Sequence, residues 1–531
     1  MYLVRQKRKN GIYYYAVEKK RIAGKVMTVK QIYLGSSETV INKLTDNSLQ
    51  ILKSKTFGSV ALLLHIEKQF GLEKIFNDSL DKKRKNDVSG KYFLSILFNR
   101  ILEPASKAGI DKWLKTTYLD WIWKLNANSQ IYWNHLDYLD DGAISKIGSK
   151  MAEKIFEKID DEEFLLDTTN HFTYIQNKDS KVLAKGKSKQ GRNDKNLVCY
   201  GLLIGSKSRI PLNLFQYKYE PDSEFLKEKI DDITKFLELY RKNKFTLVMD
   251  KGNNSENNVK KLAKYEFIGS LRKEQAAKLL EIPLENYKSS YITQKKRTVY
   301  VCDAGKKSLY DSEYRIVLSY QKESYEKQKK KFEETVKKTL EKYEKIKGKR
   351  YEKIVSASNE LNDILPKKYK KAFNKEILPE GDKYVIKLSE VSESNKLYET
   401  HFGKNVLFTN KLETPAVEIV QSYRSLNVVE DQFRTLHNAF MIPITPIFEW
   451  TDQKIKAHIF LCFLALILVR MLEYEARKKE MTITFSKLLK DAKNIRVGLV
   501  SDGKKAKYCF ERMDVEQQKI MSAFELQEFF Q

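Results

Sequence analysis

The sequence lacks the short motifs that mark several common classes of enzyme and of secreted protein. Its four cysteines lie far apart and form no C-x-x-C pair, which excludes a recognisable zinc ribbon and is typical of a reducing compartment. It contains no phosphate-binding loop, dinucleotide fingerprint or Ser-His-Asp arrangement. The first residues, MYLVRQKR, lack the apolar core of a signal peptide, so we expect the protein in the cytoplasm.

Long apolar runs are also missing. The longest, Ile459–Val469, has 11 residues, whereas a helix that crosses a bilayer needs ~20. We therefore expect no membrane partner, and we predict a buried helix at 452–478.

Arginine is scarce beside lysine. Of the 98 basic residues only 18 are arginine, while lysine, asparagine, isoleucine and tyrosine are abundant. This usage fits an AT-rich coding bias as well as selection for phosphate contacts. Even so, the net charge of +28 predicts a polyanionic partner, most simply nucleic acid. An anionic membrane surface is the alternative, but no amphipathic anchor or lipidation signal supports it.

The chain is long enough for roughly two to four domains. Its first two segments differ in the pattern of their apolar residues. Residues 1–56 predict a small basic β unit, with strands at 11–17 and 25–34. Tyr13, Tyr14 and Tyr15 suit either stacking on DNA or packing against a neighbouring strand. Residues 57–159 show helical periodicity and predict a helical domain, a possible reader of DNA ends.

An α/β pattern begins at residue 160. The order strand, strand, strand, helix and strand over 160–251 predicts a mixed sheet. The apolar strand that starts at Phe164 is expected to end at Asp167, and the strand that starts at Phe245 to end at Asp250. Sites form at the carboxyl ends of strands in open sheets. Two such carboxylates repel each other without a cation, so they favour a metal site, although strand-end carboxylates can also be structural.

A third carboxylate lies in the segment 422–437, which we predict to be one helix. Its apolar residues recur at spacings of three and four, and Tyr423, Glu430, Arg434 and His437 fall near a second stripe. A carboxylate between an aromatic hydroxyl and two basic groups suits a metal ion beside phosphate. A solvated helix face with incidental pairs is the alternative.

The remaining segments surround this core. Residues 252–404 predict an insertion domain whose charged helix, 323–350, has few apolar positions, so we expect it to protrude into solvent or lie along a partner. Residues 405–478 return to the core, beginning with a strand at 405–410. Residues 479–531 predict a mostly helical tail.

Taken together, these motifs resemble the DDE transposases of bacterial insertion sequences, in the branch with a tyrosine-arginine-glutamate-lysine signature around the glutamate. The resemblance covers residues 160–478. Its anchors are the segments LLDTT at 165–169, YGLLI at 200–204 with IPL at 210–212, LVMDKG at 247–252, LFTN at 407–410, VEDQFR at 429–434 and HIFLCFLAL at 458–466.

The resemblance implies a ribonuclease-H-like mixed sheet with helices on both faces, interrupted by the insertion domain. It implies that Asp167, Asp250 and Glu430 are catalytic and bind two Mg²⁺ or Mn²⁺ ions. It also implies that the protein cuts double-stranded DNA at element ends, joins the 3′-hydroxyl ends to target DNA, acts as a homodimer on paired ends, and lies on the bacterial nucleoid.

The signature is incomplete here. Tyr423 stands seven residues before Glu430 as the signature requires, but Leu426 occupies the arginine position and His437 the lysine position. Arg424 and Arg434 are the candidates for the missing positive charge. Tyr423, Arg424, Arg434 and His437 are accordingly the expected DNA contacts.

Two related functions fit the same residues. A ribonuclease-H-like nuclease that cuts DNA without joining it would share the three carboxylates. A catalytically silent DNA-binding protein derived from a transposase would keep the basic charge and need no metal, but clustered carboxylates are unfavourable without a cation.

Overall fold

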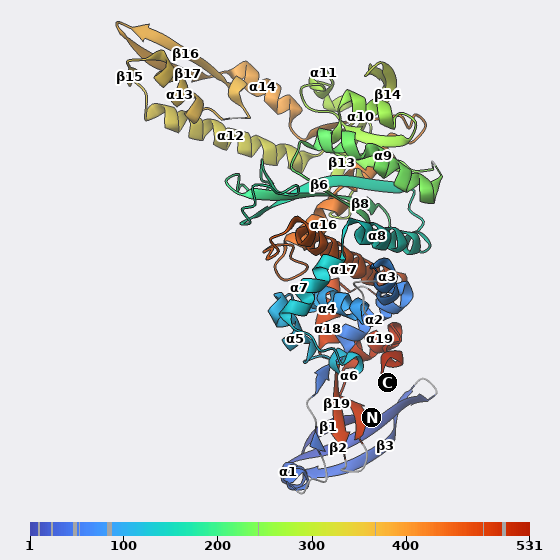
Figure 1. Ribbon diagram of the computed structural model, residues 1–531. Helices are drawn as coiled ribbons and strands as arrows, with labels where there is room; N and C mark the ends of the chain where they lie inside the picture. Colours follow the sequence, from blue (N-terminus) through green and yellow to red (C-terminus); the bar gives the residue numbers. More distant parts are fainter. Residues whose placement is uncertain are drawn as a thin grey trace. The chain divides into compact units, whose positions relative to one another are not determined.

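The computed structural model describes residues 1–8, 11–22, 25–45, 50–51, 54–81, 88–242, 244–366, 368–481, 483–501 and 506–530. The chain divides into two units (Figure 1): the first joins residues 1–220 with 427–531, and the second is 221–426.

Helix α17 (Asp452–Lys478) is the centre of the first unit and has the bounds predicted from the sequence. Thr451 caps it by accepting a hydrogen bond from the Lys454 amide. Every residue from Ala457 to Val469 is buried. The helix is long and apolar enough to cross a membrane, but 89% of its apolar window is buried inside the structure, as in a core helix. A helix that is apolar on all sides needs packing partners on all sides.

The partners of α17 come from the predicted helical segment and from a sheet. It contacts α2, α4, α7 and α8 on the helical side and β9 on the sheet side. Gly71, in the left-handed region at φ 61°, turns the chain between the first two helices. The helices are α2 (Gly58–Phe70), α3 (Leu72–Ser79), α4 (Ser89–Leu102), α5 (Lys107–Leu114), α6 (Leu119–Trp123), α7 (Ser129–Tyr138) and α8 (Asp141–Phe156).

The sheet strands of this unit are antiparallel. Strand β8 (Asn196–Gly205) lies between β6 (Glu163–Thr173) on one side and β9 (Pro211–Tyr217) with β7 (Ala184–Lys185) on the other. The prediction that this strand ends at Asp167 is wrong: Asp167 pairs with Leu202 in the middle of β6. The β-branched and aromatic residues that follow Asp167 continue the ladder as far as Thr173.

The two ends of the chain form further small sheets. Strands β1 (Tyr2–Arg8), β2 (Gly11–Ile22) and β3 (Lys25–Ser36) are antiparallel, and α1 (Ser37–Thr45) follows them. The ring of Tyr33 lies 6.2 Å from that of Tyr13 and 5.2 Å from that of Tyr15, so these two tyrosines pack against the neighbouring strand.

The C-terminal segment is less helical than predicted. Its hairpin of β19 (Arg496–Ser501) and β20 (Ala506–Phe510) pairs with β4 (Gln50–Ile51) and β5 (Lys55–Thr56). Its helices are α18 (Phe485–Lys493), α19 (Val515–Ala523) and the short 3-10 helix η4 (Leu526–Phe529).

The second unit contains a mixed sheet. Its strand order is β12 (Ser289–Ile292), β13 (Thr298–Leu309), β14 (Ser312–Tyr320), β18 (Lys404–Thr409), β11 (Glu266–Ser270) and β10 (Thr246–Met249). Only the β10–β11 pair is parallel within this set. Helix α15 (Ala416–Arg424) contacts β10, β11, β12, β13 and β14. Helix α9 (Asp222–Arg241) contacts α10 (Glu256–Leu262).

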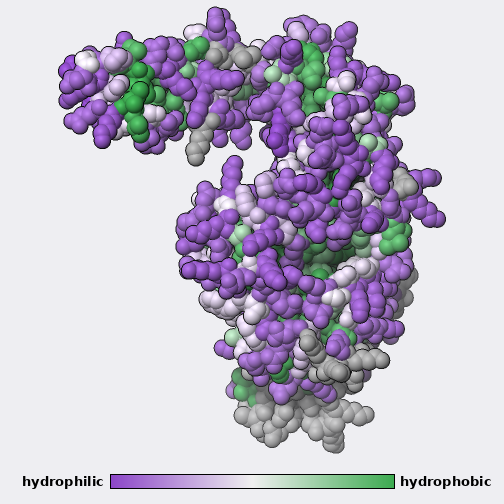
Figure 2. Space-filling view, turned by 45° about the horizontal axis from the view of Figure 1, so that its top comes forward, coloured by the Kyte–Doolittle hydropathy of each residue, from purple (hydrophilic) through white to green (hydrophobic). Residues whose placement is uncertain are grey.

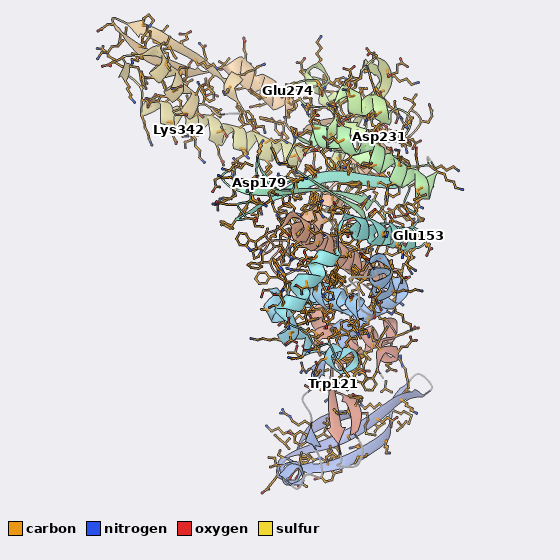
Figure 3. All side chains as sticks on the ribbon, viewed as in Figure 1. Trp121, Glu153, Asp179, Asp231, Glu274 and Lys342 are labelled. Atoms are coloured by element: carbon orange, nitrogen blue, oxygen red, sulfur yellow. The ribbon has the colours of Figure 1, made fainter. Side chains whose placement is uncertain are left out.

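The charged helix of the insertion has a core of its own. Helix α12 (Lys322–Glu344) buries Phe332, Val336 and Tyr343, although Lys342 and most of its other charged residues are exposed (Figure 3). The predicted sparse apolar pattern and solvated charged surface are present, but the few apolar residues lie on one face and are buried, so the helix does not protrude alone. They pack with residues of β15 (Arg350–Tyr351), α13 (Ile354–Ile364), β16 (Phe373–Glu380), β17 (Lys383–Glu390) and the segment after α14 (Ser392–His401).

The burial of α17 predicts a matched pair of stability effects. Val469 is fully buried in α17, and Val515 is 67% exposed at the start of α19. We expect Val469→Ala to lower the free energy of unfolding by about 2 kcal/mol, because it removes buried methyl groups. We expect Val515→Ala to change it by less than about 0.5 kcal/mol. Denaturant unfolding measures both, and equal effects would contradict a core role for α17.

Candidate functional site

Helix α16 (Asn427–His437) presents Glu430 on its exposed side. Val429, Phe433 and Leu436 form the buried side, and the helix contacts α17 and β6. Glu430 lies in the first turn, where the helix dipole favours a carboxylate. Glu430 is thereby held on a helix that contacts the strand carrying Asp167.

Arg470 of α17 fixes α16 in place. Its Nε donates to the Gln432 side-chain oxygen at 2.5 Å and its Nη2 to the Thr435 hydroxyl at 2.7 Å. Gln432 and Thr435 are both buried. These bonds to a charged donor set the rotation of α16 and hence the direction of its exposed side.

Asp167 is half-buried in the middle of β6, and the next residue, Thr168, accepts a hydrogen bond from a lysine. Asp167 Oδ1 accepts a hydrogen bond from the Thr168 amide at 2.7 Å. The Lys189 ammonium donates to the Thr168 carbonyl oxygen. A positive charge therefore lies one residue from Asp167 along the strand.

Lys189 belongs to the basic segment 186–195, which is tied to β6. The Lys189 amide donates to the Asn170 side-chain oxygen at 2.9 Å, and the Asn170 side-chain nitrogen donates to the Lys187 carbonyl at 3.2 Å. The Ser188 amide donates to Asn193 Oδ1 at 2.8 Å. A cationic segment held by backbone bonds suits a polyanionic chain, because its charges are already positioned.

Two histidines pack together beside this segment. The rings of His171 on β6 and His437 on α16 lie 3.8 Å apart between centroids. His171 Nε2 lies 2.7 Å from the Tyr200 hydroxyl, and His437 Nδ1 lies 3.4 Å from Gln190 Nε2.

Both imidazoles favour the neutral form. Burial lowers the pKa of His171 well below its usual value, and the adjacent His437 lowers it further. Burial also lowers the pKa of His437, with the charge of Lys189 acting in the same direction. His437 stands where the resemblance expects a lysine, and its lowered pKa favours a neutral, hydrogen-bonding imidazole near pH 7.

The prediction of one continuous helix from 422 to 437 is wrong. Helix α15 ends at Arg424 and α16 begins at Asn427. The Ser425 hydroxyl bonds to the Ser422 carbonyl at 2.5 Å, and the Ser425 amide is shared between two carbonyls. Serine and asparagine compete for backbone bonds in this way and favour helix ends. Tyr423 consequently belongs to the second unit and Glu430 to the first.

Asp250 follows β10 directly, as predicted, and Tyr423 contacts it. The Tyr423 hydroxyl donates to Asp250 Oδ1 at 2.8 Å. Arg424, the next residue, donates from Nη2 to the Gln321 side-chain oxygen at 3.4 Å. Of the expected DNA contacts, Tyr423 is thus a direct partner of a candidate metal ligand.

Arg434 is exposed and pairs with Asp431 on the same helix. Exposed pairs of this kind contribute little to stability. Its expected contact with DNA stays a prediction.

The donor atoms suit a hard divalent cation. Asp167, Asp250 and Glu430 offer carboxylate oxygens, which Mg²⁺ and Mn²⁺ prefer. After Asp250, the buried side-chain oxygens of Asn253 and Asn254 have no hydrogen-bond partner among the described residues. Within the same described part of the chain, no three His, Cys, Asp or Glu side chains form a ready-made metal cluster. The shared site of all three carboxylates therefore stays a prediction.

Comparison with solved structures gives a weak structural likeness. No family model and no curated protein matches the chain. One solved structure with a similar arrangement is described as the cryo-EM structure of a piggyBac transposase synaptic complex with hairpin DNA. The match has 10% sequence identity and a TM-score of 0.38, and it covers 83% of this chain and 80% of that one.

Sequence reasoning missed His171, Tyr200 and Lys189 as parts of the site. The basic segment was visible in the sequence, but nothing in it indicated which lysine reaches β6. His171 lies four residues after Asp167, at an even spacing that puts both on one face of a strand, and this alternation is the signal that was available.

The buried imidazoles predict acid sensitivity. The unfolded chain binds protons near the usual histidine pKa of about 6.5, whereas folded His171 and His437 resist protonation. Stability from these residues is therefore complete above about pH 6.5 and is lost as the pH falls below it.

We expect His171→Phe to flatten this dependence, because the variant removes one of the two groups and keeps an aromatic ring. Denaturant unfolding at several pH values between about 5 and 7.5 measures the slope. Parallel curves for the wild type and the variant would show that His171 does not contribute to it.

Proposed function

We propose that the protein is a DDE transposase with a ribonuclease-H-like core, in which Asp167, Asp250 and Glu430 bind two Mg²⁺ or Mn²⁺ ions. The observation that carries the proposal is the segment 416–437. It supplies Tyr423, which holds Asp250, and α16, which carries Glu430 and contacts the strand of Asp167.

The short chain segment from Tyr423 to Asn427 supports the same proposal. The chain passes from Tyr423 to Asn427 in four steps, each about 3.8 Å between Cα atoms, so these residues lie within about 15 Å of each other. One short connection thus carries a residue bonded to Asp250 and the helix of Glu430.

Asp167, Asp250 and Glu430 would hold the divalent cations, which would supply Lewis-acid chemistry for the attacking and leaving oxygens. Other side chains of the protein hold these carboxylates in position. Tyr423 orients Asp250 through its hydroxyl, and Arg470 sets the rotation of α16 and so of Glu430. Lys189 and the segment around it carry positive charge beside Asp167, where a DNA phosphate would approach.

The charge and surface of the molecule support DNA as the partner. The face drawn in Figure 2 is predominantly hydrophilic, and 32% of all residues are charged, with basic residues in excess. The expected steps are cleavage at the element ends and joining of the 3′-hydroxyl ends by a protein dimer on paired ends.

The direct test is a cleavage and joining assay. Purified full-length protein is incubated with Mg²⁺ or Mn²⁺ and DNA that carries this gene with its native flanks. Metal-dependent cuts at the flanks followed by joined products support the proposal. Cuts without joining favour a nuclease, and binding without cuts favours a silent DNA-binding descendant.

The three carboxylates give the sharpest variants. We expect Asp167→Asn, Asp250→Asn and Glu430→Gln each to reduce cleavage by at least about 100-fold while DNA binding persists, because each removes a metal ligand. Asp431→Asn is the matched control, since this carboxylate is the exposed neighbour of Glu430 and pairs with Arg434. A triad variant with cleavage equal to that control would be removed from the metal site.

The bond between Tyr423 and Asp250 predicts a smaller effect. We expect Tyr423→Phe to lower the rate of cleavage by about 10- to 100-fold, because partners that orient a metal ligand have effects of this size. Tyr343→Phe also deletes a hydroxyl that donates to a backbone carbonyl, but within the insertion core. Equal rates for the two variants would refute an orienting role for Tyr423.

A further inference from the structure

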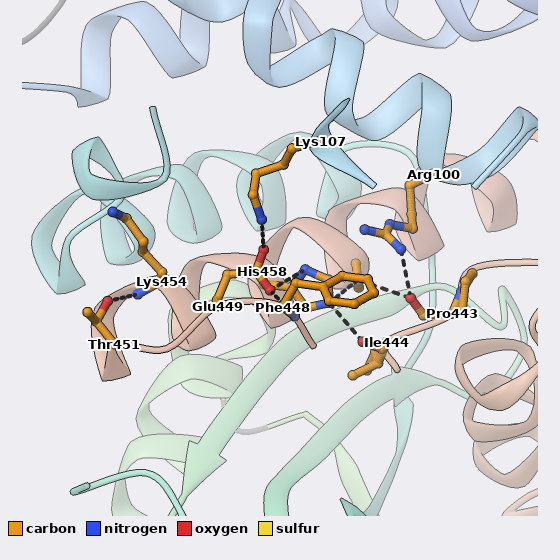
Figure 4. Close-up of polar contacts among 10 residues, drawn as sticks. Arg100, Lys107, Pro443, Ile444, Phe448, Glu449, Thr451, Lys454 and His458 are labelled. Carbon is orange, nitrogen blue, oxygen red and sulfur yellow. Dashed lines mark hydrogen bonds and ion pairs between the residues drawn. The ribbon is translucent and has the colours of Figure 1, made fainter. Parts of the chain in front are cut away.

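A cavity with a mostly apolar wall and a few charged groups lies in the first unit, away from the candidate site. Its volume is about 290 Å³, and it opens among α4, α5, α17 and the segment 439–449. Its charged or reactive side chains are Arg100, Lys107, Glu449, His458 and Cys462. Figure 4 shows the polar contacts around it.

His458 is held between two acceptors. Its Nε2 donates to the Ile444 carbonyl at 2.8 Å, and its Nδ1 lies 3.6 Å from Glu449 Oε2. The Nε2 contact is a hydrogen bond, whereas the Nδ1 contact is an ion-pair distance to a buried carboxylate. An anion this close favours the charged form of His458.

Glu449 is in turn fixed as a carboxylate. Lys107 Nζ lies 2.7 Å from its Oε1, and the Phe448 amide donates to its Oε2 at 3.0 Å. Although burial raises the pKa of Glu449, the charges of His458 and Lys107 outweigh burial and lower it. Glu449 is thus a fixed anion facing His458 Nδ1.

Cys462 follows His458 by one helical turn on α17. Its Sγ lies 3.8 Å from His458 Nε2 and 3.9 Å from the Pro443 carbonyl oxygen. Arg100 Nη1 donates a hydrogen bond to that oxygen at 3.1 Å. Three cationic groups, Arg100, Lys107 and His458, face one carboxylate in this wall. A thiolate reduces that imbalance of charge.

The same neighbours act on the thiol. Burial by itself raises the pKa of Cys462, but the charge and hydrogen bond of His458, together with Arg100, outweigh burial and lower it. For His458, burial acts to lower the pKa, and Cys462 with Glu449 raises it above the usual value. The pair therefore favours the thiolate and imidazolium forms.

We propose that Cys462 is a nucleophilic thiolate that hydrogen peroxide, entering the cavity, oxidises to a sulfenic acid. The sulfur attacks one peroxide oxygen, so an S–O bond forms and the O–O bond breaks. Sulfur loses two electrons and the peroxide gains them. The leaving hydroxide takes a proton from the His458 imidazolium and departs as water. Glu449 and His458 are positioning residues for this step.

The test measures the reactivity of each cysteine in the folded full-length protein. Short pulses of iodoacetamide between about pH 6 and 9, followed by mass spectrometry of peptides, give an alkylation rate for every cysteine. We expect Cys462 to react about tenfold faster at pH 7 than Cys199, Cys302 and Cys509, none of which lines this cavity. Treatment with hydrogen peroxide and dimedone should label Cys462 alone.

A matched pair of variants tests whether Glu449 acts on Cys462 through His458. Glu449 itself raises the pKa of Cys462, but His458 has the larger, opposite effect and Glu449 helps to keep His458 charged. We therefore expect Glu449→Gln to slow alkylation of Cys462 about fivefold at pH 7 and to move its pH midpoint upward. Glu473→Gln, on the same helix but paired with Arg470 outside the cavity, should leave the rate unchanged. Where circular dichroism shows that Glu449→Gln is unfolded, Arg100→Gln replaces it, because Arg100 also stabilises the thiolate.

Alkylation of Cys462 at the rate of the other three cysteines in the folded protein would overturn the proposal. An alkylation rate of Cys462 that neither the Glu449 nor the Arg100 variant changes would also overturn it, because the surrounding groups would then have no effect on the reactivity of the thiol.

Discussion

The burial of α17 on all sides is the constraint on which the first unit depends. A helix with no polar face must be enclosed, and helices from one segment of the chain and a sheet strand from another enclose it. The same helix then carries the polar residues that arrange its surroundings. Arg470 binds Gln432 and Thr435 on α16, and His458 with Cys462 forms the wall of the cavity. Packing and site geometry are therefore set by one element.

The break between α15 and α16 separates Tyr423 from Glu430 along the chain. Tyr423 holds Asp250 within the second unit, and α16 contacts the strand of Asp167 within the first. The charge that the incomplete signature lacks need not come from the same helix, because Lys189 reaches β6 from the segment 186–195. A neutral His437 beside it avoids repulsion between two cations.

The sequence predicted elements whose periodicity was strong and missed features that depend on pairing or on long-range contact. The bounds of α17, the position of Asp250 after β10 and the helix α9 followed from apolar patterning. The strand was predicted to end at Asp167 because most residues after it are polar. These residues nevertheless pair with β8 as far as Thr173. The break at Ser425 was missed because the apolar spacing continues across it. The core around α12 was missed because its partners come from distant segments.

The central proposal is that Asp167, Asp250 and Glu430 bind the same metal ions, and titration of the full-length protein with Mn²⁺, followed by electron paramagnetic resonance, tests it most directly. We predict two bound ions per chain in the wild type and weaker binding when Asp250 or Asp167 is changed to asparagine. Binding that stays at full strength after both changes, or that weakens after only one of them, would contradict the proposal.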